Sequence, residues 1–231
     1  MNRVLQAVRL HFIHPMVAIA MPWVIVGLAF AINLAIWHLT PAGAEDGGFT
    51  GGILALYITL LIGYVQSVTQ LLPFAMGMSL SRRSFYLGLS VVALIEALGY
   101  GVVLSALTAV EQATGGWGAD MAFWAPGPLD VDNAALQVLV SGAPILLFAF
   151  LGIGMGVVSK RWGPSGAWIV TLGTTIFFGA LSILITWRDW WGAIGTWLAD
   201  QSVTTLAVGL PVALAAALAV VAFVGIRRVV P

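Results

Sequence analysis

Cysteine is absent from this sequence of 231 residues, and charged side chains are scarce. Asp, Glu, Lys and Arg make up only 8% of the residues, against about 25% in a typical soluble domain. The lack of cysteine excludes disulfides, thiolate metal sites and a cysteine nucleophile. Nine basic and nine acidic residues cancel, which removes any case for nucleic-acid binding. So few charges cannot cover a water-facing surface, and we therefore expect an integral membrane protein.

The signatures of several kinds of enzyme are also missing. There is no G-x-x-x-x-G-K-[ST] motif and Lys160 is the only lysine, so the chain cannot hydrolyse ATP through a phosphate loop. The three histidines, His11, His14 and His38, all precede residue 39 and form no H-E-x-x-H pair. Gly77-Met78-Ser79 is only faintly similar to the serine motif of a rhomboid-type protease, and no later histidine could act as base. We expect no catalytic residue and no metal site.

What the sequence does contain is long apolar runs. Hydrophobic residues make up 61% of the chain, and the mean hydropathy is +1.04. A transmembrane helix needs about 20 largely apolar residues. Six runs of that length are present, at about 15–38, 53–76, 85–110, 136–158, 166–187 and 203–226. The sequence therefore predicts an all-α membrane protein with six transmembrane helices in a single transmembrane domain, residues 1–231.

The few charges are segregated between alternate connections. Eight of the nine basic residues precede the first span, follow the sixth, or lie between spans two and three or four and five: Arg3, Arg9, Arg82, Arg83, Lys160, Arg161, Arg227 and Arg228. Eight of the nine acidic residues fall in the other connections: Glu45, Asp46, Glu111, Asp120, Asp130, Asp132, Asp189 and Asp200. Because basic residues concentrate on the cytoplasmic side of membrane proteins, the pattern predicts cytoplasmic N and C termini.

Three segments outside the spans have recognisable patterns. Residues 187–201 repeat tryptophan and aliphatic side chains at helical spacing, which predicts an external Trp-rich helix before the sixth span. The longer external connection, 111–135, carries Trp117 and Trp124, which we expect at the lipid headgroups. Residues 1–14 predict an amphipathic helix in the inner membrane interface, because one face gathers Val4, Leu5, Val8 and Phe12.

Polar residues inside the second span are candidates for a substrate path. Gln66 and Gln70 share a helix face with Gly63 and Pro73, and Thr69 lies alongside. An amide in hydrocarbon is costly unless it is hydrogen-bonded, so this face should meet other helices or water. The same residues could instead form the hydrogen bonds that hold a helix bundle together. Both interpretations stay open.

Glu96 lies near the middle of the third span. A carboxylate at that depth costs about 2.5–3.5 kcal/mol on insertion scales. No basic residue lies inside any predicted span, so we expect Glu96 to be protonated, reached by water, or bonded to Gln66, Gln70 or Asn33. It is a candidate for substrate contact or gating, or else a structural residue.

Small residues recur on the same helix at every fourth position: Ala93, Ala97, Gly101, Ser105 and Ala109. Such spacing lets helix backbones approach closely. The close approach could occur inside one bundle or between subunits.

The stretch from Leu72 to Gly88, LPFAMGMSLSRRSFYLG, resembles the second-helix exit and first cytoplasmic loop of bacterial ABC-type permeases of the type-2 (ABC-2-like) exporter superfamily. The N-terminal interfacial helix, the six spans and the external helix before the sixth span agree with that family. The resemblance implies a multi-pass permease subunit in the bacterial plasma membrane, moving substrate outward at the expense of ATP. The ATPase activity would reside in a separate subunit, which would bind ATP and magnesium, and this chain would carry no cofactor.

In that family the loop after the second helix docks on the ATPase subunit. Carried over by resemblance, the coupling loop would comprise Ser79, Ser81, Arg82, Arg83, Ser84 and Phe85. A half-size permease would pair with itself as a homodimer, or with a related permease subunit. The aromatic, nearly uncharged bundle favours an amphipathic or lipophilic substrate. Two alternatives are a proton-coupled secondary transporter using Glu96 and a non-transporting membrane scaffold or assembly factor.

Overall fold

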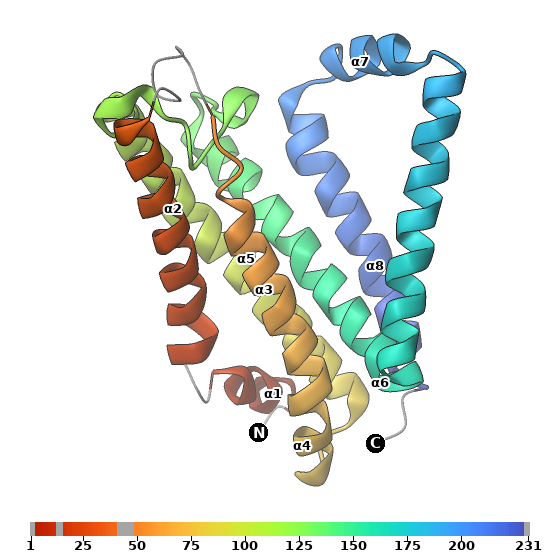
Figure 1. Cartoon of the computed structure of the whole chain (residues 1–231). Helices are drawn as coiled ribbons and strands as arrows, with labels where there is room; N and C mark the ends of the chain where they lie inside the picture. The colour runs from red at the N-terminus through yellow and green to blue at the C-terminus, as the bar shows by residue number, and fades with distance from the viewer. Residues whose placement is uncertain (1–2, 13–15, 41–48, 229–231) are drawn as a thin grey trace.

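The computed structural model describes residues 3–12, 16–40 and 49–228, and these form helices with no β-strand. Among the described residues, five helices are long and apolar enough to cross a membrane. They are α2 (Met21–Leu39), the rod Leu54–Gly77 that contains α3 (Leu54–Gln66) and α4 (Leu72–Gly77), α5 (Arg82–Ala113), α6 (Ala134–Trp187), and the rod Thr204–Ile226 that ends in α8 (Leu210–Ile226). Figure 1 shows them as an elongated bundle. The all-α prediction is confirmed for this part of the chain.

Helix α6 is far longer than a bilayer is thick. Its 54 residues would span about 81 Å at 1.5 Å per residue, against about 30 Å of hydrocarbon. Gly163 interrupts it with φ +69° and ψ −169°, a conformation that glycine adopts readily, and Pro164 follows. Figure 1 shows two helical segments diverging from this bend. The segments, 134–162 and 164–187, cover the predicted spans 136–158 and 166–187.

Helix α1 (Arg3–His11) packs on the beginning of α5. A Cβ added to Gly88 would lie 2.5 Å from the Cβ of Ala7, so the glycine permits the close approach of the two helices. The buried residues of α1 are Ala7 and Leu10, whereas Leu5, which belongs to the apolar face predicted for the membrane interface, is 55% exposed. The prediction of a helix is confirmed. The face of α1 that packs on α5 is the one that carries Ala7, whose small side chain lies against Gly88.

Helices α5 and α6 approach closely through small residues. A Cβ on Gly101 would lie 2.5 Å from the carbonyl oxygen of Val138, and one on Gly142 would lie 2.5 Å from the carbonyl oxygen of Ala97. Ala109, at the far end of the predicted stripe of small residues, is exposed. Within the described residues, Ala97 and Gly101 are therefore used inside one bundle.

The connection after α5 folds back over the helices. The aromatic rings of Phe30, Trp117, Phe123 and Trp124 contact one another with centroid distances of 4.7–5.4 Å. Trp124 is only 7% exposed, so its ring contacts protein and not solvent or lipid. The ring is buried because it stacks on Phe30 of α2 beneath the connection.

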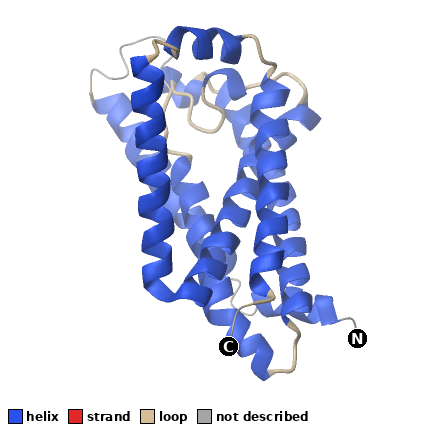
Figure 2. Ribbon diagram, turned by 90° about the vertical axis from the view of Figure 1, so that its right-hand side faces the viewer, coloured by secondary structure: helices blue, strands red, loops and turns tan. Residues whose placement is uncertain are grey.

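The elements also segregate between the two ends of the bundle. In Figure 1, α1, the junction of α4 and α5, the bend at Gly163 and the end of α8 lie at one end, and α7 (Trp191–Ala199) lies at the other. Figure 2 shows the same arrangement from the side. All eight basic residues grouped from the sequence belong to the first set of segments. His14, Glu45 and Asp46, which are named in the sequence predictions, lie outside the described residues, as does position 15, where the first predicted span begins.

Candidate functional site

A cavity of about 590 Å³ lies between α2, α3 and α5, with the end of α1 as part of its wall. Its volume is in the range of small-molecule pockets, about 300–1,000 Å³. Most of the lining is apolar. The polar lining side chains come from four segments of the chain: His11, Thr59, Tyr64, Gln66, Ser67, Gln70 and Glu96.

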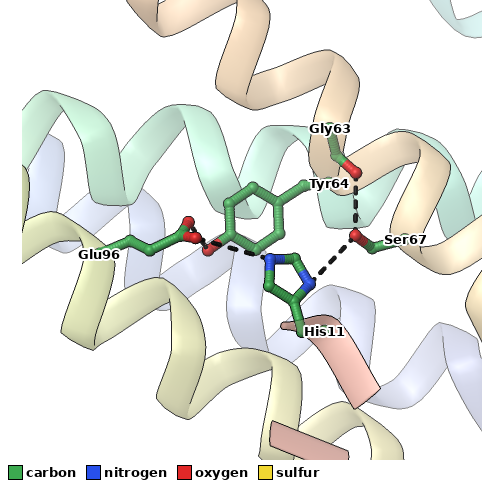
Figure 3. Close-up of polar contacts among 5 residues, drawn as sticks. All are labelled: His11, Gly63, Tyr64, Ser67 and Glu96. Carbon is green, nitrogen blue, oxygen red and sulfur yellow. Dashed lines mark hydrogen bonds and ion pairs between the residues drawn. The ribbon is translucent and has the colours of Figure 1, made fainter. Parts of the chain in front are cut away.

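Glu96 is the buried acidic side chain of this cavity, with 7% of its surface exposed. The hydroxyl of Tyr64 donates a hydrogen bond to its Oε2 over 2.6 Å. Beside this bond, Nε2 of His11 lies 3.5 Å from Oε1 of the same carboxylate (Figure 3). Two partners from α1 and α3 therefore offset the cost of burying this carboxylate on α5.

The imidazole of His11 is held on three sides. Its Nδ1 lies 3.3 Å from the hydroxyl oxygen of Ser67, and that hydroxyl also bonds the carbonyl oxygen of Gly63 over 2.9 Å (Figure 3). Its ring stacks on the ring of Tyr64 with a centroid distance of 5.8 Å and an angle of 22°. His11 thus ties α1 to α3 and α5 at the polar part of the cavity.

The partners that we expected for Glu96 are not the ones that it has. Asn33 donates to the carbonyl oxygen of Ala29 over 2.8 Å, one turn earlier in its own helix. Gln66 and Gln70 line the cavity but are exposed, and within the described residues neither side-chain amide has a hydrogen bond. His11 is not predicted as a partner from the sequence, because it lies outside the spans in which a basic partner for Glu96 was expected. A histidine at the end of an amphipathic N-terminal helix was the available signal.

Three of the four substrate-path candidates lie together. Gln66, Gln70 and Glu96 line the cavity, whereas Thr69 is not among its lining residues. The Thr69 hydroxyl instead bonds the carbonyl oxygen of Val65 over 2.9 Å. Thr69 lies beside the glutamines in sequence, but its hydroxyl is satisfied by its own helix.

A widened helical turn brings part of this lining into place. Residues Ser67–Leu71 form a π-helical turn that ends two residues before Pro73. Proline has no N–H to donate to the preceding turn, and single π turns often occur at functional sites. The turn contributes Ser67 and Gln70 to the cavity. The same spacing recurs in Met16–Ala20 before Pro22 and in Thr204–Gly209 before Pro211.

The predicted coupling loop forms a tight turn between α4 and α5. Ser79 adopts a positive φ of 63°, and the hydroxyl of Ser81 accepts a hydrogen bond from the backbone N–H of Ser84 over 3.1 Å. That bond caps the first turn of α5, so Ser81 has a local structural role. Ser79 and Ser81 are exposed, and Ser84 is half-buried.

The remaining three residues of that loop differ in accessibility. Arg83 is exposed. Arg82 is half-buried, and its Nη1 donates to the carbonyl oxygen of Arg227 over 3.4 Å. Phe85 is 2% exposed and belongs to the core, so it is not available to a partner in this conformation. The exposed surface is therefore narrower than the predicted loop and centres on Ser79, Ser81 and Arg83.

Comparisons with known proteins assign no family to the chain. No protein-family model matches the sequence, and no significant match exists among curated proteins or solved structures. The proposed function therefore rests on the cavity and the exposed turn.

Proposed function

We propose that the chain is the permease subunit of an ATP-driven exporter of the type-2 ABC class, working with a separate ATPase subunit in a bacterial plasma membrane. The observation that carries the proposal is the exposed turn after α4, which bears Ser79, Ser81 and Arg83. It follows a helix that lines the cavity and precedes the helix that carries Glu96. A partner bound there would act on both helices.

The proposed topology has six crossings, with α6 crossing twice about the bend at Gly163. A double crossing is supported by the length of α6, which exceeds the hydrocarbon thickness more than twofold. By the positive-inside rule, we assign the end that contains α1, the exposed turn and the end of α8 to the cytoplasm. An ATPase subunit holding ATP and magnesium would then have access to the turn.

The permease would work as a homodimer or beside a related subunit. Side chains of the second segment of α6 are exposed over most of its length, including Trp168, Ile176 and Phe178. In a membrane, such a face meets lipid or another permease subunit. The mostly apolar cavity supports an amphipathic or lipophilic substrate.

The test begins with the phosphate-loop ATPase that the proposal requires, sought first in the neighbouring gene. Because the chain has no cysteine, Met78→Cys introduces a single cross-linking site in the exposed turn. We expect it to cross-link to the ATPase, while Thr196→Cys in α7 does not. Arg83→Glu should abolish co-purification and leave membrane insertion intact, and Arg188→Glu is the matched control. Equal co-purification of the Arg83 and Arg188 variants would defeat the docking proposal.

A second candidate is a proton-coupled secondary transporter. It is favoured by one observation, the contact between two ionisable side chains, His11 and Glu96, in the cavity wall. Such a protein would transport in proteoliposomes under a pH gradient with no ATPase present. Transport that strictly requires ATP and the partner subunit would exclude this candidate.

A further inference from the structure

We infer that the cavity binds an amphiphile with one positively charged nitrogen, and that its cationic head replaces His11 beside Glu96 and displaces one proton. The inference deepens the proposed function by naming the class of substrate, and it rests on that function only for the step from binding to transport. Binding itself requires neither the ATPase nor a membrane gradient.

The charge of the site selects a cation. Among the described lining residues, Glu96 is the only acidic side chain and His11 is the only basic one. A carboxylate in a medium of low dielectric is stabilised by an adjacent positive charge. When His11 carries a proton, it supplies that charge at 3.5 Å. A ligand that brings its own permanent charge makes the protonated imidazole unnecessary.

The position that the His11 imidazole occupies is also favourable for a cationic nitrogen of a ligand. The ring of His11 lies over the ring of Tyr64 at a centroid distance of 5.8 Å. A cation within about 6 Å of an aromatic centroid is attracted by the face of the ring. A ligand head at this position would contact both the carboxylate of Glu96 and the ring of Tyr64. The amides of Gln66 and Gln70, which have no hydrogen bond among the described residues, can serve polar groups next to that head.

The rim of the cavity suits an apolar tail. Met21 and Ile25 of α2, Ile62 of α3 and Phe74 of α4 line the cavity and are 54%, 36%, 49% and 55% exposed. All four are apolar and belong to segments long enough to cross a membrane. The rim therefore faces hydrocarbon, where an alkyl chain remains while the head reaches Glu96. The cation could come from a soluble amphiphile or from the amine headgroup of a lipid.

The exchange balances in charge and protons. In the occupied site the ligand cation lies beside the Glu96 carboxylate, His11 has moved away from that carboxylate and is neutral, and the proton that His11 carried goes to solvent. No covalent bond forms or breaks. Among the described residues, the titratable groups facing the carboxylate are His11 of α1, Tyr64 of α3 and Tyr100 of α5 itself.

The test is calorimetric titration of the purified full-length chain in an uncharged detergent. The probe is decyltrimethylammonium below its micellar concentration, and decanol is the uncharged control of equal chain length. Titrations in two buffers of different protonation enthalpy give the affinity and the number of protons released. We expect about one proton per bound cation, and an affinity that rises by about tenfold per pH unit while His11 remains protonated.

Two variants separate the roles of the ionisable pair. Glu96→Gln should weaken binding by at least about 30-fold, the ratio that corresponds to about 2 kcal/mol for a lost charge pair. His11→Gln should bind the cation more tightly than the wild type at acidic pH and release no proton. Asp200→Asn, which removes an exposed carboxylate outside the cavity, is the matched control.

Two outcomes would overturn the inference: equal affinity for decanol and the cation, or cation binding by the wild type without proton release at every pH between about 5 and 8. Both are measured on the wild type, so the inference stays testable even if Glu96→Gln does not fold. Competition by phosphatidylethanolamine, but not by phosphatidylglycerol, would assign the site to a lipid headgroup; absence of competition would assign it to a soluble amphiphile. Cross-linking of Met78→Cys to the ATPase is independent of these results, so the proposed function and this inference can fail separately.

Discussion

Replacing Glu111 with leucine is expected to release the connection between α5 and α6 from the bundle. The Oε2 atom of Glu111 accepts hydrogen bonds from Nε1 of Trp117 over 3.0 Å and from the backbone N–H of Phe123 over 2.9 Å. The backbone N–H of Trp124 donates to Oε1 over 3.3 Å. One buried side chain thus satisfies three donors of the connection.

The expected magnitude follows from which donors lose their partner. The N–H groups of Phe123 and Trp124 belong to buried residues, whereas Trp117 is half-buried and its indole could bond to water. A buried donor left without a partner costs about 1–3 kcal/mol. The two backbone donors together should therefore lower the free energy of opening the connection by about 2–6 kcal/mol. The stacked ring of Phe30 remains and opposes complete release.

Hydrogen exchange followed by mass spectrometry measures this opening directly. A peptide covering 121–125 should exchange at least about 30-fold faster in the Glu111→Leu variant, because about 2 kcal/mol corresponds to that ratio in the open population. A peptide from the first segment of α6 is the internal control. Glu111→Gln, which keeps one acceptor oxygen, should give an intermediate rate. Unchanged exchange at 121–125 would show that the aromatic contacts alone hold the connection, and the reasoning would be refuted.

Three further predictions concern the bundle and its topology. Gly142→Leu should lower stability by at least about 1–3 kcal/mol in detergent unfolding, because its Cβ would lie 2.5 Å from a backbone oxygen of α5. Gly154→Leu is the matched control, since no atom lies within 4 Å of its Cβ. Tyr86→Phe removes a 2.6 Å hydrogen bond to the carbonyl oxygen of residue 219 and should lower stability by about 0.5–1.5 kcal/mol in the same assay. On intact cells, an impermeant maleimide should label Thr196→Cys and not Ser165→Cys; labelling of both would contradict a double crossing by α6.

The helices were predictable because each depends on a local run of apolar residues. The second predicted span, 53–76, corresponds to the rod Leu54–Gly77, and the third, 85–110, lies within α5. Helix α5 begins before the third predicted span. Ser81 caps the helix through its hydroxyl, so α5 begins at Arg82, three residues before the apolar run.

The contents of the cavity were only partly predictable. Glu96 stood out because an isolated carboxylate in an apolar run is rare. Its partner His11 lies 85 positions earlier in the chain, and only the packing of α1 on α5 brings the two together. The pattern on the second span likewise grouped Thr69 with Gln66 and Gln70. Helical spacing alone does not reveal that the Thr69 hydroxyl bonds the backbone.

The shortness of α4 has a mechanical consequence. The helix has six residues, and Phe74, its third, lines the cavity, whereas the exposed turn begins just after its last residue, Gly77. At 1.5 Å per residue, the wall of the cavity and the turn are separated by less than about 10 Å of helix. A force applied to the turn would tilt α4 and so move the wall of the cavity directly. The helix would pivot at the π-helical turn Ser67–Leu71, and the movement would not need to pass through other side chains of the bundle.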